Sequence, residues 1–318
     1  KLLENRTQDI KPCICCHSGC FNFSSCKGHA NTQDLSDTMG LARCALNPET
    51  MQSRKYHLEP AKKLKTIAII GGGIGGMEAA LVCAKRGHKV TLYERSSTLG
   101  GVFIAAAAPS FKEKDRELIA WYIRELQKYP ITIKLNTEIK SVASLSADEV
   151  IVATGATARK INVTGAETAI EAIDYLLGSR EVGANVAVIG GGLTGCEIAY
   201  DLYLKGKHPT IIEMQDDLIT TKGICLANTS YLRDFFKTNK VPVFLETSLS
   251  QIKSGSVELI DKTGNQFALP ADSVIMSVGY TPAPIAAKGK HIHVIGDAAK
   301  VGNLRTVIWG AWDACMNL

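Results

Sequence analysis

The sequence predicts an α/β fold in which two copies of one βαβ unit follow a short cysteine-rich segment. Residues 66–94 and 185–213 align without a gap and are identical at eleven of 29 positions. In each copy a β-branched run leads through a glycine-rich turn into a helical apolar pattern and then a second apolar run. Four of the ten cysteines lie within Cys13–Cys20, ahead of the first copy. The chain therefore contains a repeated module preceded by a segment with a separate role.

Length and composition are those of a globular protein. With 318 residues, 46% hydrophobic and 21% charged, the chain is long enough for two or three domains. The net charge of +5 is spread over scattered Lys and Arg residues, so a nucleic-acid partner is not expected. The most apolar stretch, residues 66–84, contains Glu78 and five glycines, which predicts a strand, a turn and a helix, and no membrane span. The composition is compatible with a homo-oligomer and does not determine the oligomeric state.

The distribution of cysteines predicts the redox environment. Six of the ten lie in the first 44 residues, and the other four lie in apolar helical or strand-like segments. No secretory signal precedes them, and disulfide frameworks of secreted proteins are not arranged in this way. We therefore expect reduced thiols, a metal-binding first segment and a cytoplasmic location.

Each copy carries the GxGxxG pattern of a dinucleotide-binding turn. The glycines are Gly71, Gly73 and Gly76 in the first copy and Gly190, Gly192 and Gly195 in the second. In such a turn the first glycine permits the bend, the second lets a pyrophosphate approach the backbone, and the third lets helix and strand pack closely. Glu94 and Glu213 each follow the first glycine by 23 residues, where a carboxylate accepts hydrogen bonds from ribose hydroxyls. Two complete copies predict two Rossmann-like domains.

Three further segments, "LGG" at 99–101, "ATG" at 153–155 and "GD" at 296–297, resemble those of the two-dinucleotide flavoprotein reductases. The resemblance implies FAD in the first unit, with Asp297 on the ribityl chain, and NAD(P)H in the second. It assigns to FAD Gly71, Gly73, Gly75, Gly76, Glu94, Gly101, Ala153, Thr154, Gly155, Gly296 and Asp297. It assigns to NAD(P)H Gly190, Gly192, Gly195, Glu213 and Gly279. The expected domains are 1–60 for the remnant of a preceding barrel with the metal-binding cysteine segment, 61–160 with 283–318 for FAD, and 161–282 for NAD(P)H.

The end of the second copy favours NADH over NADPH. A 2′-phosphate beside the Glu213 carboxylate would be repelled, and the following residues, "MQDDL", offer no Lys or Arg to bind it. NADH is therefore the expected nucleotide, and NADPH is the alternative.

The clustered cysteines predict a metal centre. Cys13, Cys16 and Cys20 form a CxxCxxxC run, and Cys44 is the next candidate ligand. Four thiolates suit zinc or an iron-sulfur cluster, but three grouped cysteines closed by a distant fourth favour a four-iron four-sulfur (4Fe-4S) cluster. Cys15 is interpreted as a bystander, and Cys26 stays open as an alternative fourth ligand.

Together these motifs resemble the C-terminal half of the 2,4-dienoyl-CoA reductase and 2-enoate reductase family, relatives of old yellow enzyme. The resemblance rests on CxxCxxxC, CxxNP, GGGxGGMEAA, LGG, ATGA and VIGGGLTGCEIA as they stand in this chain. In that family an N-terminal TIM barrel carries FMN and reduces a carbon-carbon double bond with electrons passed from NAD(P)H through FAD and the cluster. The barrel is absent here, so the resemblance implies an electron-input fragment without the ene-reducing site and without a catalytic acid or base. The barrel of the full-length chain would be its partner.

Three other functions stay open. A nucleotide-binding scaffold that holds only ADP would resemble relatives of trimethylamine dehydrogenase. A stand-alone NADH oxidoreductase would pass electrons to a separate acceptor protein. A zinc-stapled interaction module would contain no redox centre. Cys196, Trp309 and Trp312 are predicted to pack in the core and to take no part in the chemistry.

Overall fold

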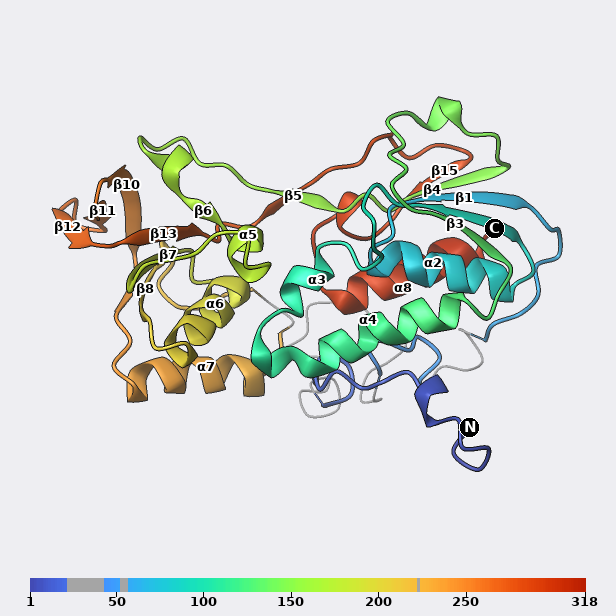
Figure 1. Cartoon of the computed structure of the whole chain (residues 1–318), viewed down its shortest axis with the longest axis horizontal. Coiled ribbons are helices and arrows are strands. Elements are labelled where there is room, and N and C mark those ends of the chain that lie inside the picture. Colours follow the sequence, from blue (N-terminus) through green and yellow to red (C-terminus); the bar gives the residue numbers. More distant parts are fainter. Residues whose placement is uncertain (22–42, 52–56, 222–223) are drawn as a thin grey trace. The chain divides into compact units, whose positions relative to one another are not determined.

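The computed structural model describes residues 1–21, 43–51, 57–221 and 224–318 and divides into two compact units (Figure 1). Unit 1 comprises Lys1–Ala107, Lys112–Thr157 and Thr281–Leu318, and unit 2 comprises Ala108–Phe111 and Ala158–Tyr280. Cys26, the alternative fourth metal ligand, lies outside the described residues.

Unit 1 is built on a five-stranded parallel sheet in the order β15-β4-β1-β2-β3. Its strands are β1 (Thr66–Ile70), β2 (Lys89–Tyr93), β3 (Ile131–Lys134), β4 (Glu149–Val152) and β15 (Ile292–Val294). Ile69 of β1 pairs in register with Leu92 of β2 and Ile151 of β4, and all three side chains are fully buried. Burial on both faces explains why these strands are continuous apolar runs.

Helices cover one face of this sheet. They are α2 (Ile74–Lys85), α3 (Phe103–Ala106), α4 (Glu113–Leu126) and α8 (Leu304–Met316). The short 3₁₀ turns η1 (Thr7–Asp9), η3 (Ser110–Lys112), η4 (Val142–Ser144) and η6 (Gly296–Ala298) lie in the connections. Figure 1 shows α2 beside α8, and α4 packs against α2 on its other side. Ile67 and Ile69 face these helices, while Ala68 and Ile70 face a second cluster with Val150 and Val152.

Unit 2 repeats the plan with a parallel sheet in the order β6-β13-β7-β8-β9. Its parallel strands are β6 (Ile170–Glu171), β7 (Asn185–Ile189), β8 (His208–Ile212), β9 (Val243–Phe244) and β13 (Ser273–Met276). Its helices are η5 (Ala166–Thr168), α5 (Ala172–Leu176), α6 (Leu193–Leu204) and α7 (Leu226–Thr238). An antiparallel sheet of β10 (Thr247–Lys253), β11 (Ser256–Asp261) and β12 (Gln266–Pro270) completes it.

The internal repeat extends one strand further than the sequence analysis found. Residues 147–155 read ADEVIVATG and residues 271–279 read ADSVIMSVG. They form β4 and β13, which pair with β1 and β7 at the same place in the two sheets. Asp148 accepts a hydrogen bond from the Thr66 amide at 2.7 Å, and Asp272 accepts one from the Asn185 amide at 2.7 Å. The duplicated module is therefore β-α-β plus this third strand.

Two strands carry the chain between the units. β5 (Ala156–Ala158) follows β4, β14 (Tyr280–Pro282) follows β13, and these two strands pair with each other. Gly155 and Gly279 precede them with φ of +73° and +93°, a backbone conformation that favours glycine. The predicted α/β fold with two parallel-sheet domains is confirmed.

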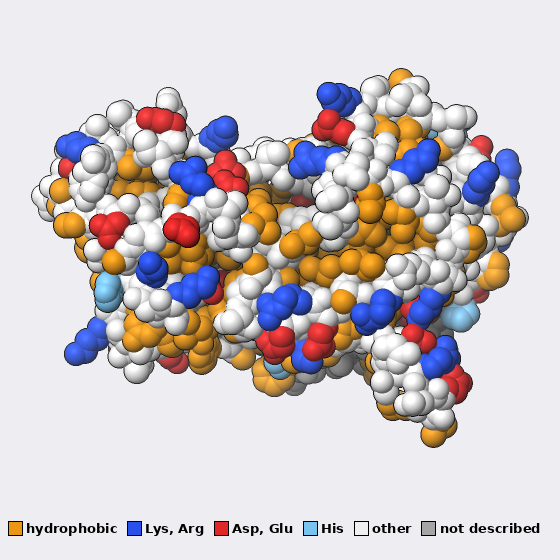
Figure 2. Space-filling view, viewed as in Figure 1, with side chains coloured by type: hydrophobic (Ala, Val, Ile, Leu, Met, Phe, Trp, Pro, Cys, Tyr) orange, Lys and Arg blue, Asp and Glu red, His pale blue; other side chains and the backbone are white. Residues whose placement is uncertain are grey.

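The surface carries mixed charge. On the face shown in Figure 2, Lys and Arg side chains stand among Asp and Glu side chains, so neither sign forms a continuous stripe. Among the helices that the structure describes, none combines the length and apolar character needed to cross a bilayer.

Candidate functional site

Both glycine turns have backbone geometry that requires glycine. Gly71 has φ of +105°, and a Cβ there would lie 2.4 Å from the Ala153 carbonyl oxygen. A Cβ on Gly76 would lie 1.8 Å from the Gly71 carbonyl oxygen, so the helix could not approach its own turn with any larger residue. The second unit repeats this geometry: a Cβ on Gly190 would lie 2.3 Å from the Ser277 carbonyl oxygen, and a Cβ on Gly195 would lie 1.9 Å from the Gly190 carbonyl oxygen.

The helices after these turns begin without a capping side chain. Gly73 and Gly192 are the N-cap residues of α2 and α6, and neither helix has a side-chain hydrogen bond at its N-cap. By contrast, the N-terminus of α8 is closed by a capping box between Asn303 and Thr306. The first amides of α2 and α6 are thus left for an outside acceptor at the positive end of the helix dipole, as a pyrophosphate requires.

Backbone without side chains surrounds the start of α2. Gly73 forms a bridge with Gly100, and a Cβ on Gly101 would lie only 3.0 Å from the Gly73 Cα. Gly100, with φ of +126°, donates its amide to the Gly72 carbonyl at 2.9 Å and was not selected from the sequence. A Cβ on Gly75 would lie 3.1 Å from Val307 of α8. These glycines leave a space, the glycine cradle, that a phosphate-bearing ligand can enter. A side chain in place of these glycines would fill that space.

Glu94 binds the turn itself. Its carboxylate, 6% exposed, accepts hydrogen bonds from the Gly72 amide at 2.6 Å and from the amide and hydroxyl of Ser96 at 2.8 and 2.7 Å. Glu213 accepts the Gly191 amide at 2.5 Å and the Gln215 amide at 2.8 Å in the same manner. An ionised carboxylate has about four acceptor positions. Each therefore fixes its turn and retains capacity for a ribose hydroxyl.

Two segments beside the first glycine turn carry the remaining residues assigned to FAD. Ala153 donates its amide to Ile70 at 2.8 Å, and the Thr154 hydroxyl donates to the Ala283 carbonyl at 2.7 Å. Asp297 lies in η6 and accepts the Gly302 amide at 3.0 Å. Partial burial raises the pKa of Asp297, so a hydroxyl donor would stabilise its charged form.

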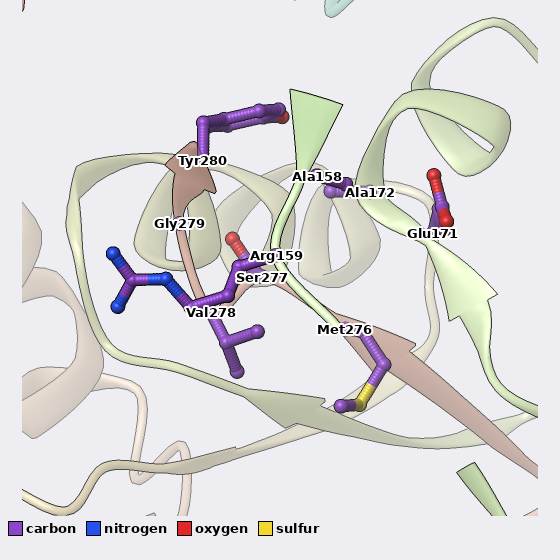
Figure 3. Close-up of a pocket in the computed structure, with 9 residues that line it drawn as sticks. All are labelled: Ala158, Arg159, Glu171, Ala172, Met276, Ser277, Val278, Gly279 and Tyr280. Carbon is purple, nitrogen blue, oxygen red and sulfur yellow. The ribbon is translucent and has the colours of Figure 1, made fainter. Parts of the chain in front are cut away.

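A pocket in unit 2 adjoins the second glycine turn at Ser277 (Figure 3). It is lined by Ala158, Arg159, Glu171, Ala172, Met276, Ser277, Val278, Gly279 and Tyr280. It lies at the carboxyl ends of β6 and β13, where open α/β sheets bind ligands. Figure 3 shows Arg159 and Glu171 on opposite sides of the pocket. The Arg159 amide donates to the Gly279 carbonyl at 2.9 Å. Arg159 was not predicted as a site residue from the sequence, because it lies in no recognised motif.

The four predicted metal ligands share a local fold. The amides of Cys15 and Leu46 donate to the sulfur atoms of Cys13 and Cys44 at 3.3 and 3.4 Å, and the Ser18 backbone hydrogen-bonds Cys16. Three of the four sulfur atoms thus accept a hydrogen bond from the amide of the residue two positions later. Burial raises the pKa of Cys16, and the thiols of Cys44, Cys20 and Cys13 raise it further, so all four lie within electrostatic range. Within the described ranges, no three of these or other His, Cys, Asp or Glu side chains are placed so that they could hold a metal ion.

Of the residues predicted to be bystanders, Cys15 lies beside the predicted ligand Cys13, and the others lie in the cores of the two units. Cys15 is exposed, and its pKa is raised first by Cys13 and by burial, with Lys114 and Glu113 of α4 among its neighbours. Cys196 is fully buried in α6, where burial raises its pKa to about 12. Trp309 and Trp312 are each 7% exposed in the core of unit 1, as predicted.

Comparison with known proteins identifies the family to which the chain is similar. Residues 40–146 and 65–301 match the family described as pyridine nucleotide-disulphide oxidoreductase. The chain is 35% identical to a cinnamate reductase of Clostridium sporogenes and 32% identical to an NADH oxidase of Thermoanaerobacter brockii, covering 100% and 96% of this chain and 47% of each relative. A solved complex of 2-naphthoyl-CoA reductase with 2-naphthoyl-CoA superposes with a TM-score of 0.88 at 24% identity, over 100% of this chain and 48% of that one. The chain spans about half the length of the curated relatives it matches, and the resemblance indicated by the motifs is confirmed.

Proposed function

The chain belongs to the pyridine nucleotide-disulphide oxidoreductase family, and from this premise we propose that it is the electron-input half of an NADH-dependent ene reductase of the enoate or dienoyl-CoA type. It is an NAD(P)H-dependent flavin oxidoreductase, as its relatives named reductase and oxidase indicate. The observation that carries the proposal is the duplicated turn, in which an uncapped helix start and a buried glutamate are reproduced in both units.

Unit 1 would hold FAD. The amides at the start of α2 and the glycine cradle of Gly73, Gly100 and Gly101 suit a pyrophosphate, and Glu94 suits a ribose. Asp297, half-buried in η6 after β15, is suited to a ribityl hydroxyl. When bound, FAD supplies hydride acceptance from the nicotinamide. The protein contributes orientation and electrostatics to this chemistry, and we assign no acid or base.

Unit 2 would hold NADH. Gly192 has no atom within 4 Å of the position a Cβ would take, so the backbone there is open to a pyrophosphate. Gly279 is equally open and lines the pocket with Arg159. Glu213 would accept a ribose hydroxyl and oppose a 2′-phosphate.

Cys13, Cys16, Cys20 and Cys44 would hold a 4Fe-4S cluster. Their fit rests on four thiols within electrostatic range, three of which accept backbone amides, a feature that stabilises cluster sulfur atoms. When bound, the cluster supplies one-electron transfer. The acceptor would be FMN in an N-terminal TIM barrel of the full-length protein, supported by relatives about twice as long as this chain.

Anaerobic titration with NADH, followed by visible absorption, tests the proposal. We expect the purified protein to show a flavin band and a broad iron-sulfur shoulder, and both to bleach with NADH. A protein that binds ADP and shows no flavin band would overturn the proposal in favour of the nucleotide-binding scaffold. A purified protein that contains zinc and no iron would overturn the proposed 4Fe-4S cluster.

Nucleotide preference can be changed without disturbing the turn. Glu213 must stay, because its loss would leave the buried amides of Gly191 and Gln215 without their acceptor. Met214 is 68% exposed beside it. We expect Met214→Arg to lower the KM for NADPH about tenfold, since one charge-assisted hydrogen bond to a 2′-phosphate is worth about 1.4 kcal/mol. Steady-state assays with both nucleotides, with Met214→Gln as the uncharged control, measure this; an unchanged NADPH to NADH ratio would contradict it.

The ligand set can be tested by single substitutions. We expect Cys44→Ser to lose most of the iron while FAD stays bound, because the glycine cradle does not include the cysteine segment. Cys15→Ser is the matched control and should retain iron, because Cys15 is an exposed neighbour of Cys13 outside the predicted ligand set and serine keeps a hydrogen-bonding side chain there. Iron and flavin content per chain decide the question. Full iron content in Cys44→Ser would contradict Cys44 as the fourth ligand and indicate Cys26 in its place.

A further inference from the structure

Two cysteines meet between α2 and α8, in the core of unit 1. Cys83 lies in the last turn of α2 and Cys315 in the last turn of α8, and both are 0% exposed. The Cys315 sulfur lies 3.6 Å from the carbonyl oxygen of Ala79, one helical turn before Cys83. The Cys83 side chain also hydrogen-bonds the Cys315 thiol. The two thiols are therefore neighbours, and we call Cys83 and Cys315 the core thiol pair.

The packing of α2 against α8 explains why these two side chains meet. Figure 1 shows α2 beside α8. Near the start of both helices, a Cβ on Gly75 would lie 3.1 Å from the Val307 side chain. Four residues later in each helix come Ala79 and Ala311, both fully buried, and four residues later again comes the core thiol pair. Small residues one turn apart let the two backbones approach closely. A disulfide between helices requires such an approach, because its Cα atoms lie about 4.4–6.8 Å apart.

Burial keeps the core thiol pair in the thiol form. It raises the pKa of Cys315 well above the usual value, and Cys83 raises it further. Because the thiolate is the reactive form, the closed core protects the pair from oxidants. Arg86 fastens this end of α8: its guanidinium donates hydrogen bonds to the Cys315 carbonyl and, at 3.1 Å, to the Glu59 carbonyl. Opening of the last turn of α8 would expose the pair to solvent.

We propose that the core thiol pair is an oxidation site, at which a peroxide converts Cys83 and Cys315 into a disulfide that joins α2 to α8 when the last turn of α8 opens. One sulfur attacks a peroxide oxygen, becomes a sulfenic acid and, with its thiol proton, releases water. The second sulfur then attacks the sulfenic sulfur, the S–S bond forms and a second water leaves. The two sulfur atoms give up two electrons, which reduce the O–O bond of the peroxide.

The inference goes beyond the proposed function and does not depend on it. The core thiol pair lies at the C-terminal end of α2, about 15 Å along the helix from the glycine turn at its start. The disulfide would join the two helices of unit 1 at this end, whichever nucleotide the turn binds. Its expected effect is on the stability of the fold under oxidising conditions.

Peptide mapping after oxidation tests the inference. The reduced protein is treated with hydrogen peroxide, and the remaining thiols are alkylated in urea before digestion without reductant. We expect the peptide that contains Cys83 to be joined to the peptide that contains Cys315. Cys196 is the internal control and should be recovered alkylated, because it is equally buried and Arg233 and Glu213, not a thiol, are the groups that act most on its pKa after burial. Recovery of Cys83 and Cys315 as separate alkylated thiols, or as sulfinic acids, would overturn the inference.

Thermal unfolding provides a second measurement. A disulfide that closes a long loop of chain stabilises the fold, so peroxide should raise the unfolding midpoint of the wild type by about 10 °C relative to Cys83→Ala treated in the same way. Cys315→Ala should behave like Cys83→Ala, whereas Cys196→Ala should keep the rise. Equal midpoints in the oxidised wild type and oxidised Cys83→Ala would contradict a disulfide between the helices.

Arg86→Met tests the route by which the oxidant enters. Loss of the charge-assisted hydrogen bond to the Cys315 carbonyl should favour opening of the last turn about tenfold, which corresponds to about 1.4 kcal/mol, and should accelerate disulfide formation by the same factor. Arg124→Met is the control, because Arg124 is an exposed cation in the last turn of α4. An unchanged rate in Arg86→Met would overturn opening of α8 as the route. A disulfide that forms only in urea would show that the pair is closed to oxidants in the folded protein and would overturn the oxidation site.

Discussion

Gly76→Ala is expected to remove bound flavin, whereas Gly195→Ala is expected to retain flavin and lose the response to NADH. Each new Cβ would lie 1.8 or 1.9 Å from the first carbonyl oxygen of its own turn. No rotamer relieves this contact, because both partners are backbone. The helix must move away from its strand at a cost of about 3 kcal/mol or more, and the amides that would face a pyrophosphate move with it.

The pair works as a test because the two units have separate cores. Residues around Gly76 pack into the helix-covered face of the unit 1 sheet, and those around Gly195 pack between α6 and the unit 2 sheet. Flavin content is measured by absorption after purification, and NADH binding by fluorescence or by bleaching. Gly310→Ala in α8 is the control, since a Cβ there meets no atom within 4 Å. Loss of flavin in Gly195→Ala with retention in Gly76→Ala would reverse the assignment of the cofactors.

The sequence was sufficient for the parts of the molecule that depend on local pattern. The GxGxxG turns, the helix after each and the acidic end of each second strand follow from residues within about 30 positions, and the structure has them where they were predicted. The strand that ends in the ATG segment was predicted, but its second copy, β13, was missed as part of the repeat, because Glu149 and Ser273 differ in charge at equivalent positions and the apolar core of each strand is only four residues long. Short apolar runs do not identify themselves by periodicity.

Other features could not be derived from pattern because they join distant segments. The hydrogen bond from Trp309 to Cys44 spans 265 positions, and nothing in the local sequence of either residue points to the other. Glu94 and Glu213 were predicted to bind a ribose. In the structure both carboxylates also accept hydrogen bonds from buried amides of their own turns. A carboxylate at the end of a strand has the same sequence signal for both roles. Only the distance to Gly72 and Gly191 distinguishes them.

The second large effect is expected for Glu149, which lies at the end of the unit 1 sheet opposite the glycine turn. It is 5% exposed at the first position of β4 and accepts hydrogen bonds from Lys65 at 2.7 Å and from His293 at 2.9 Å, with His291 at 3.4 Å. His293 lies in β15, the strand that leads to Asp297. The carboxylate therefore ties the edge strand that presents Asp297 to the centre of the sheet.

The ionisation of Glu149 gives this contact a defined pH dependence. Burial alone would raise its pKa, but the hydrogen bonds from Lys65, His293 and His291 outweigh burial and lower the pKa to about 2 from its usual 4.5. A carboxyl whose pKa is lower in the folded state stabilises the fold above its unfolded pKa. The contribution, about 3 kcal/mol at neutral pH, is lost as pH falls from about 4.5 towards 2.

Glu149→Gln should therefore lower the free energy of unfolding of unit 1 by about 3 kcal/mol at pH 7, and the difference from wild type should shrink below pH 4.5. The amide keeps the shape of the side chain but provides no charge for Lys65. Urea unfolding at pH 7, 4.5 and 3 measures the change, and Glu138→Gln is the control, because its ion pair with Lys140 is exposed and 3.8 Å long. An equal loss of stability at all three pH values would show that Glu149 acts by packing alone, and that β15 is held to β4 by its backbone hydrogen bonds and apolar contacts.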